Sequence, residues 1–111
     1  MNFTYTAEPD ECAEDKIVTL TCEFSPAVAN SDAITISKHR GDGLYDFVLL
    51  ECTIQTTASE EFLRYNLTAC DASGVASIDI MPYDDFDNGL WRCQIFEGDF
   101  EYDEIELAIN C

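Results

Sequence analysis

Six cysteines are the residues of this 111-residue chain whose types and spacing carry the clearest chemistry. They stand at Cys12, Cys22, Cys52, Cys70, Cys93 and Cys111. An even number of cysteines in so short a chain is typical of disulfides formed in an oxidising compartment. The sequence has no CxxC pair, so a zinc site is poorly supported. Six cysteines permit many alternative pairings, so the connectivity stays open at this point.

Catalytic chemistry is poorly supported by the remaining reactive residues. The single histidine, His39, has no nucleophile signature near it, and a hydrolase triad needs such a base. Acid pairs such as Asp84-Asp85 are expected by chance in a carboxylate-rich chain. The acids of the Glu97-Gly98-Asp99 segment could supply oxygen ligands to calcium, but they do not match an EF-hand. The chain is therefore predicted not to be an enzyme and to need no metal or cofactor.

The net charge is strongly negative, with 23 acidic residues against 5 basic ones and a formal charge of −18. Such a field repels phosphate backbones and anionic lipid surfaces, so nucleic acid and direct membrane insertion are not expected partners. A solvated acidic surface is the simplest explanation of the charge.

Two segments match the N-glycosylation acceptor pattern, Asn2-Phe3-Thr4 and Asn66-Leu67-Thr68. Together with the cysteines they indicate an extracellular glycoprotein. The sequence has neither a signal peptide nor an apolar run of membrane length. The expected location is therefore the ectodomain of a cell-surface (type I membrane) protein or a secreted protein.

Hydrophobic alternation with a period of two residues predicts an all-β fold and one domain over residues 1–111. The expected strands cover residues 17–24, 34–37, 47–54, 63–67, 75–80, 90–96 and 105–111. In the first of these, the even positions from Val18 onward should face the core. No segment has the length and 3.6-residue period of a long helix.

A turn is predicted at residues 39–43, where the sequence reads HRGDG. Glycine supplies positive φ and aspartate tolerates it, so Gly41-Asp42-Gly43 is good turn chemistry. The same residues contain Arg40-Gly41-Asp42, a tripeptide that integrin ligands present on loops. The integrin reading and the simple turn both remain open from sequence.

One stretch resembles a family signature. Asp87-Asn88-Gly89-Leu90-Trp91-Arg92-Cys93 is similar to the D-x-G-x-Y-x-C run of immunoglobulin domains, with Trp91 in place of the tyrosine. Cys22, at the end of Val18-Thr19-Leu20-Thr21-Cys22, matches the family's other core cysteine. The chain is thus identified as resembling a V-set domain of the immunoglobulin superfamily, which implies a two-sheet antiparallel Greek-key sandwich.

The resemblance implies three disulfides, Cys22–Cys93, Cys12–Cys111 and Cys52–Cys70, and a structural ion pair between Arg64 and Asp87. The chain departs from the family at two core positions. Ile34 stands where strand C usually carries a tryptophan, and Trp91 lacks the hydroxyl of the usual tyrosine corner. These departures point away from antibodies and towards a divergent member.

The resemblance also implies a binding face, the outer side of the G-F-C-C′ sheet. The predicted face consists of Ser37, His39, Arg40, Phe47, Leu49, Leu90, Arg92, Gln94, Tyr102 and Glu104. The apolar run Phe47-Val48-Leu49-Leu50 cannot hide both its sides in a half-buried strand, so two of its side chains should lie on this face.

The implied function is extracellular recognition by an adhesion or immune-type receptor, including self/non-self recognition. The partner is expected to be a protein, either another cell-surface protein or a second copy of the chain. Two alternatives stay open: a soluble secreted binder of a microbial or toxin ligand, and an RGD-type integrin ligand.

Overall fold

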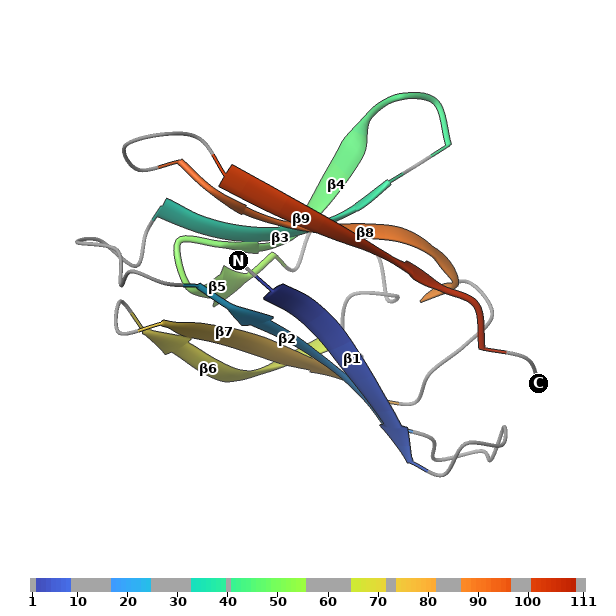
Figure 1. Ribbon diagram of the computed structural model, residues 1–111, viewed down its shortest axis with the longest axis horizontal. Coiled ribbons are helices and arrows are strands. Elements are labelled where there is room, and N and C mark those ends of the chain that lie inside the picture. The colour runs from blue at the N-terminus through green and yellow to red at the C-terminus, as the bar shows by residue number, and fades with distance from the viewer. Residues whose placement is uncertain are drawn as a thin grey trace.

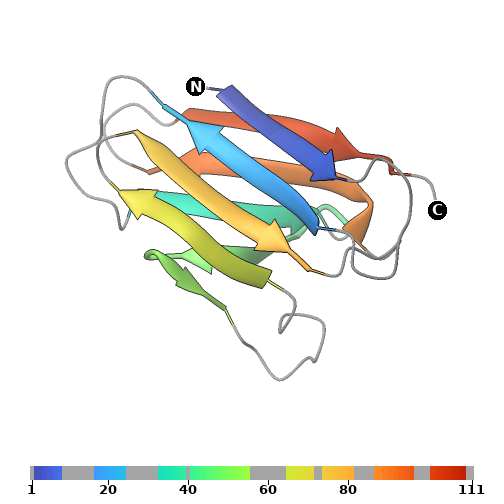
Figure 2. The same ribbon diagram turned by 90° about the horizontal axis from the view of Figure 1, so that it is seen from below.

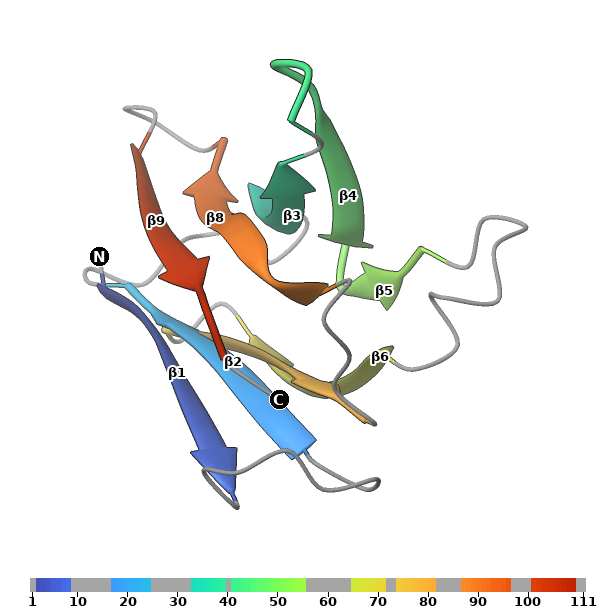
Figure 3. The ribbon, with the colours of Figure 1, turned by 90° about the vertical axis from the view of Figure 1, so that its right-hand side faces the viewer.

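The computed structural model describes residues 2–8, 17–24, 33–39, 41–55, 65–71, 74–81, 87–96 and 101–109. These residues form an all-β structure of two antiparallel sheets, which lie face to face as two layers (Figures 1 and 3). The predicted fold class is confirmed at this level. The ion pair between Arg64 and Asp87 and the Cys12–Cys111 bridge involve residues outside the described ones.

The first sheet has four strands in the order β1-β2-β7-β6. Their bounds are Asn2–Glu8 (β1), Ile17–Glu23 (β2), Val75–Ile80 (β7) and Tyr65–Asp71 (β6). All three pairings are antiparallel, and Figure 2 shows the sheet from its outer side.

The second sheet has five strands in the order β5-β4-β3-β8-β9. Their bounds are Thr53–Ile54 (β5), Tyr45–Leu50 (β4), Ile34–His39 (β3), Gly89–Ile95 (β8) and Glu101–Leu107 (β9). Strand β3 lies between β4 and β8. The β3–β4 hairpin and the C-terminal strands β8 and β9 therefore belong to one continuous sheet face.

The core lies between the sheets and follows the predicted alternation. Val18, Leu20, Cys22 and Phe24 are all buried, as expected from the even positions of β2. Ile34, the first residue of β3, is also fully buried. Burial of alternate side chains fixes the register of each strand, since a slip of one residue would expose the whole apolar set.

Strand β1 is a difference from the sequence analysis, in which the strands assigned from hydrophobic alternation began at residue 17. Phe3 pairs with Cys22 and is buried in the core. Its backbone N–H donates a hydrogen bond to the Asp103 carboxylate of β9 at 2.8 Å. Phe3, Tyr5 and Ala7 alternate with Thr4 and Thr6, so the segment has the period of two residues that a strand requires, and the contacts with β2 and β9 hold it in the sandwich.

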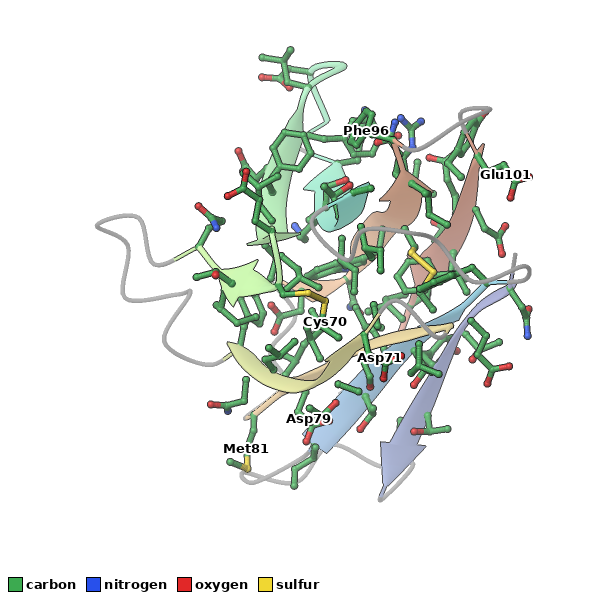
Figure 4. All side chains as sticks on the ribbon, turned by 90° about the vertical axis from the view of Figure 1, so that its left-hand side faces the viewer. Cys70, Asp71, Asp79, Met81, Phe96 and Glu101 are labelled. Atoms are coloured by element: carbon green, nitrogen blue, oxygen red, sulfur yellow. A yellow bond between two sulfur atoms is a disulfide. The ribbon has the colours of Figure 1, made fainter. Side chains whose placement is uncertain are left out.

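Among the described residues, two disulfides join the sheets. Cys22–Cys93 connects β2 with β8, and Cys52–Cys70 connects the β4–β5 turn with β6 (Figure 4). Both predicted pairings are confirmed. Each bridge of this kind is expected to stabilise the fold by about 2–4 kcal/mol, chiefly by restricting the unfolded chain. Disulfides also indicate an oxidising environment for the protein.

The β4–β5 turn contains two residues other than glycine in the left-handed region, Glu51 with φ of 53° and Cys52 with φ of 57°. Leu50 and Thr53 pair on either side of them, so they are the central residues of a two-residue hairpin. This conformation usually requires glycine or asparagine. The Cys52–Cys70 bridge anchors this costly turn to the opposite sheet.

Trp91 is the centre of a second set of contacts at one end of the core. Its indole N–H donates a hydrogen bond to the backbone carbonyl of Asp87 at 2.9 Å. The Tyr65 ring meets the indole edge to face at a centroid distance of 5.9 Å, and the Tyr65 hydroxyl donates to the buried Asp87 carboxylate at 2.8 Å. The tryptophan therefore makes the side-chain-to-backbone bond that a corner tyrosine makes with its hydroxyl.

Replacing Trp91 tests this arrangement. Trp91→Phe removes both the indole donor and buried volume, so the free energy of unfolding should fall by about 2–4 kcal/mol. Trp91→Tyr keeps a hydroxyl donor and should cost clearly less. Urea unfolding followed by far-UV circular dichroism, with the disulfides intact, measures both variants. Equal losses for the two would mean that the hydrogen bond to Asp87 contributes nothing.

Candidate recognition face

Four side chains on the outer side of the five-stranded sheet form one cluster, here called the Arg92 cluster: Tyr45, Arg92, Tyr102 and Glu104. The Arg92 guanidinium carbon lies 4.1 Å from the centroid of the Tyr45 ring and 4.5 Å from that of Tyr102. The cation is therefore held between two aromatic rings. Arginine is well suited to this place because its planar, weakly hydrated group stacks on ring faces.

Strand register brings these side chains together. Cys93 faces the core, so its neighbours Arg92 and Gln94 point outward from β8. On β9, Glu104 is the direct partner of Arg92, and Tyr102 is the partner of Gln94. Tyr45 comes from β4, which is separated from β8 by β3, and reaches the cluster across β3. The cluster thus spans four strands.

Glu104 links the polar ends of the cluster. One carboxylate oxygen, Oε2, accepts a hydrogen bond from the Tyr45 hydroxyl at 2.7 Å and lies 3.3 Å from an Arg92 nitrogen. Burial, followed by the hydrogen bond to Glu104, raises the pKa of Tyr45 above its ordinary value of 10.0. The phenol therefore stays protonated near neutral pH and can donate this bond.

The accessible part of the outer face around the Arg92 cluster is mostly aromatic. Phe47 is 41% exposed and Tyr102 is 50% exposed, while His39, Leu90, Arg92 and Glu104 are half-buried. The His39 ring meets Tyr45 edge to face at 4.9 Å. These predicted residues therefore lie where the sequence placed them, on one outer face.

Two predicted face residues point outward but are covered. Ser37 pairs with Arg92 on one side and Phe47 on the other, yet it is only 1% exposed. Gln94 is 7% exposed. Alternation gives the direction of a side chain, whereas exposure also depends on larger neighbours that cover a small residue. Ser37 and Gln94 therefore lie beneath the exposed side chains of the face.

The prediction that Leu49 belongs to the outer face is wrong, because Leu49 lies in the core with no exposed surface. A β-bulge shifts the register of the β3–β4 pair between Ile36 and Ser37, so Leu49 pairs with the inward Ile36. The bulge places both Val48 and Leu49 in the interior and leaves Phe47 on the outer side. Strict alternation, which predicts that Phe47 and Leu49 share a face, fails at such an insertion.

Tyr45 is the cluster residue that the sequence analysis missed. It stands two residues before Phe47, and both lie on β4 before the bulge. The period of two could have placed Tyr45 beside Phe47 on the outer face. No sequence signal indicates that its ring would stack on Arg92, 47 positions later, because this contact depends on the pairing across β3.

The β3–β4 connection extends beyond the rest of the sheet (Figures 1 and 3). Gly41, Asp42, Gly43 and Leu44 are all exposed there. The Gly41 N–H donates to His39 Nδ1 at 3.1 Å, and the Leu44 N–H donates to Asp42 Oδ1 at 3.0 Å. Gly41 and Gly43 have φ near +90°, as the predicted turn requires. Arg40 lies outside the described residues.

Within the described ranges, no three or more His, Cys, Asp or Glu side chains gather into a group that could hold a metal ion. The same ranges contain no helix that is long and apolar enough to cross a membrane.

No protein-family model and no curated protein is similar to the chain at a significant level. A functional proposal must therefore depend on the geometry of the chain itself.

A double-mutant cycle tests whether the stacked rings stabilise Arg92. We expect Arg92→Met and Tyr45→Leu to show a coupling of about 0.5–1 kcal/mol in the free energy of unfolding, the range of a partly exposed cation–π contact. Urea unfolding of the wild type, both single variants and the double variant measures it.

Tyr45→Phe is the matched control, because it keeps the ring over Arg92 and removes only the hydroxyl. Its cycle with Arg92→Met should therefore give a smaller coupling. Single effects of Arg92→Met and Tyr45→Leu that add within about 0.3 kcal/mol would contradict the stacking contribution.

Proposed function

We propose that this chain is an immunoglobulin V-like extracellular recognition domain that binds a protein partner through the outer face of β9, β8, β3 and β4. The observation that carries the proposal is the Arg92 cluster, a cation held between two tyrosines beside the exposed Phe47. Its parent is an adhesion or immune-type receptor with self/non-self recognition as one such role.

Topology supports the family part of the proposal. Variable-type immunoglobulin domains have one sheet of strands A, B, E and D and another in which C′ and C″ extend the G-F-C sheet. The orders β1-β2-β7-β6 and β5-β4-β3-β8-β9 correspond to these two sheets strand by strand. The Cys22–Cys93 bridge and the Trp91 bond to Asp87 occupy the places of the family's core disulfide and corner bond.

Composition supports the binding part. Tyrosine, phenylalanine and arginine are enriched at the centres of protein interfaces, and tyrosine and arginine frequently dominate the binding energy. On this face they are also held in place before a partner arrives, because Arg92 has Tyr45, Tyr102 and Glu104 as fixed neighbours. Preorganised side chains lose less conformational entropy on binding.

A second copy of the chain is one partner that the test must include. In a contact between two copies, basic Arg92 and acidic Glu104 could form a self-complementary patch. Within one molecule these two groups already lie 3.3 Å apart. A homophilic contact would therefore be formed by the exposed aromatic side chains around this ion pair, against the repulsion of the −18 charge.

Two substitutions of equal exposure test the face. Phe47 on β4 and Leu67 on β6 are each 41% exposed, on opposite sheets. We expect Phe47→Glu to weaken partner binding about tenfold or more, since it places a charge in the apolar part of the interface. Leu67→Glu adds the same charge to the other sheet and should leave binding nearly unchanged.

Binding is measured with bead-coupled domain against identical beads and against a display panel of surface and secreted proteins from the same organism. Aggregation of identical beads would identify the homophilic partner, and capture of one panel member the heterophilic one. The proposal is wrong if Leu67→Glu and Phe47→Glu weaken binding equally, or if neither bead nor panel member binds.

The exposed tip of the β3–β4 hairpin favours a second candidate function, adhesion through Arg40-Gly41-Asp42. Exposure of Gly41 and Asp42 on a projecting hairpin is what an integrin ligand requires. However, the Asp42 carboxylate also accepts the Leu44 N–H, which gives it a structural role in the turn.

Asp42→Asn separates the two roles, because the amide oxygen can still accept the Leu44 N–H while the negative charge is lost. We expect attachment of integrin-expressing cells to surfaces coated with the domain to be the same for this variant and the wild type. Integrin-dependent attachment that disappears in Asp42→Asn would contradict this expectation and establish the adhesive tripeptide. Unchanged circular dichroism would show that the turn is retained.

A further inference from the structure

Both N-glycosylation acceptor residues lie on the same outer face of the molecule. On β1, Phe3 points into the core, so Asn2 points away from it. On β6, Tyr65 is buried, and the next residue, Asn66, is exposed on the outer side. The four-stranded sheet therefore carries both acceptors, although they are 64 positions apart in the sequence.

Strand register places the two acceptors at diagonally opposite corners of this sheet. Asn2 on one edge strand stands in the row of Glu23 and Val75. Asn66 on the other edge strand stands in the row of Asp79 and Thr19. These rows are four residues apart, or about 13 Å along the strands, and the edge strands are about 14 Å apart.

The acceptor side chains are available in the folded state. Asn2, Asn66 and the hydroxyl residues of the two sequons, Thr4 and Thr68, are all exposed. Among the described residues, neither asparagine side chain is engaged in a hydrogen bond. Glycans on both residues therefore fit the fold without breaking a contact.

The surface between the two corners is polar. Thr4 pairs with Thr21, and Thr6 pairs with Thr19. Thr19 donates to Asp79 at 2.7 Å, and the Thr21 and Ser77 hydroxyls lie 3.4 Å apart. Figure 4 shows Asp79 and Met81 on the side of this sheet that faces away from the other one. A hydroxyl-rich surface of this kind suits contact with a hydrated sugar chain better than burial in an apolar interface.

We infer that Asn2 and Asn66 both carry N-linked oligosaccharides. These cover the outer face of the four-stranded sheet and leave bare the outer face of the five-stranded sheet, where the Arg92 cluster lies. In each transfer the asparagine Nδ2 bonds to C1 of the sugar. The C1–O bond to a lipid-linked diphosphate donor breaks, the diphosphate leaves, and the amide loses one proton to solvent. The sequence has no further acceptor sequon, so the five-stranded sheet receives no glycan of this type.

Occupancy is measured on the chain secreted from eukaryotic cells behind a heterologous signal peptide. Peptide mass spectrometry after amidase release in heavy-oxygen water marks each occupied asparagine as a labelled aspartate. Asn2→Gln and Asn66→Gln should each remove one glycan, and Thr4→Ala and Thr68→Ala should do the same while keeping the asparagine. Where a variant is not secreted, amidase release of the glycans from the folded wild-type protein measures the occupancy of that asparagine instead.

Hydroxyl-radical footprinting then measures the covered face. Ile17, which points outward on β2 because its neighbour Val18 is buried, and Met81, two residues after Asp79, the partner of Asn66, are 38% and 45% exposed in the bare chain. Removing the glycans should about double oxidation of these two residues, because a bulky sugar no longer covers them. Phe47 and Tyr102, with similar exposure on the other sheet, should be oxidised to the same extent before and after removal.

An unoccupied Asn2 or Asn66 would overturn the inference, and so would equal protection of the two faces. Neither result depends on a binding partner. Failure of the glycan inference is therefore distinguishable from failure of the proposed function, which the Phe47→Glu and Leu67→Glu pair tests separately.

Discussion

The Cys22–Cys93 disulfide is the constraint on which the rest of the structure depends. It joins β2 and β8, which lie inside their respective sheets, and so requires both cysteines to point into the space between the layers. Because neighbouring side chains of a strand alternate, this sends Arg92 and Gln94 to the outside. The same bond that closes the core therefore also orients the centre of the candidate recognition face.

Trp91 completes this core. Ile34 is fully buried on β3, and the indole on β8 contributes both bulk and a hydrogen-bond donor. An indole can donate but cannot accept, so its bond to the Asp87 carbonyl has one direction only. The buried Asp87 carboxylate receives the Tyr65 hydroxyl as well. One end of the core is thus fixed by polar contacts inside an apolar shell, which are costly to disrupt.

The two outer faces differ in chemistry. The five-stranded sheet presents an arginine between tyrosines beside an exposed phenylalanine, whereas the four-stranded sheet presents threonines and two glycan acceptors. Long-range repulsion from the −18 charge acts on any acidic partner, including a second copy of the chain, so short-range aromatic and hydrogen-bonding contacts must supply specificity there. This asymmetry is the basis of our two proposals, that a partner binds the five-stranded sheet and that glycans cover the four-stranded one.

The sequence by itself determined the all-β class, the inward positions of β2, β8 and β9, and the outward direction of Arg92. These follow from local alternation and from the burial of Cys22 and Cys93. The resemblance to immunoglobulin domains added the pairing of the cysteines. Only the tertiary structure decided that Tyr45 stacks on Arg92, that a bulge turns Leu49 inward, and that Ser37 is covered. Those outcomes depend on how separate strands pair and on which side chains lie over their neighbours. A period of two residues describes one strand. It contains no information about how strands pair or about which side chains cover their neighbours.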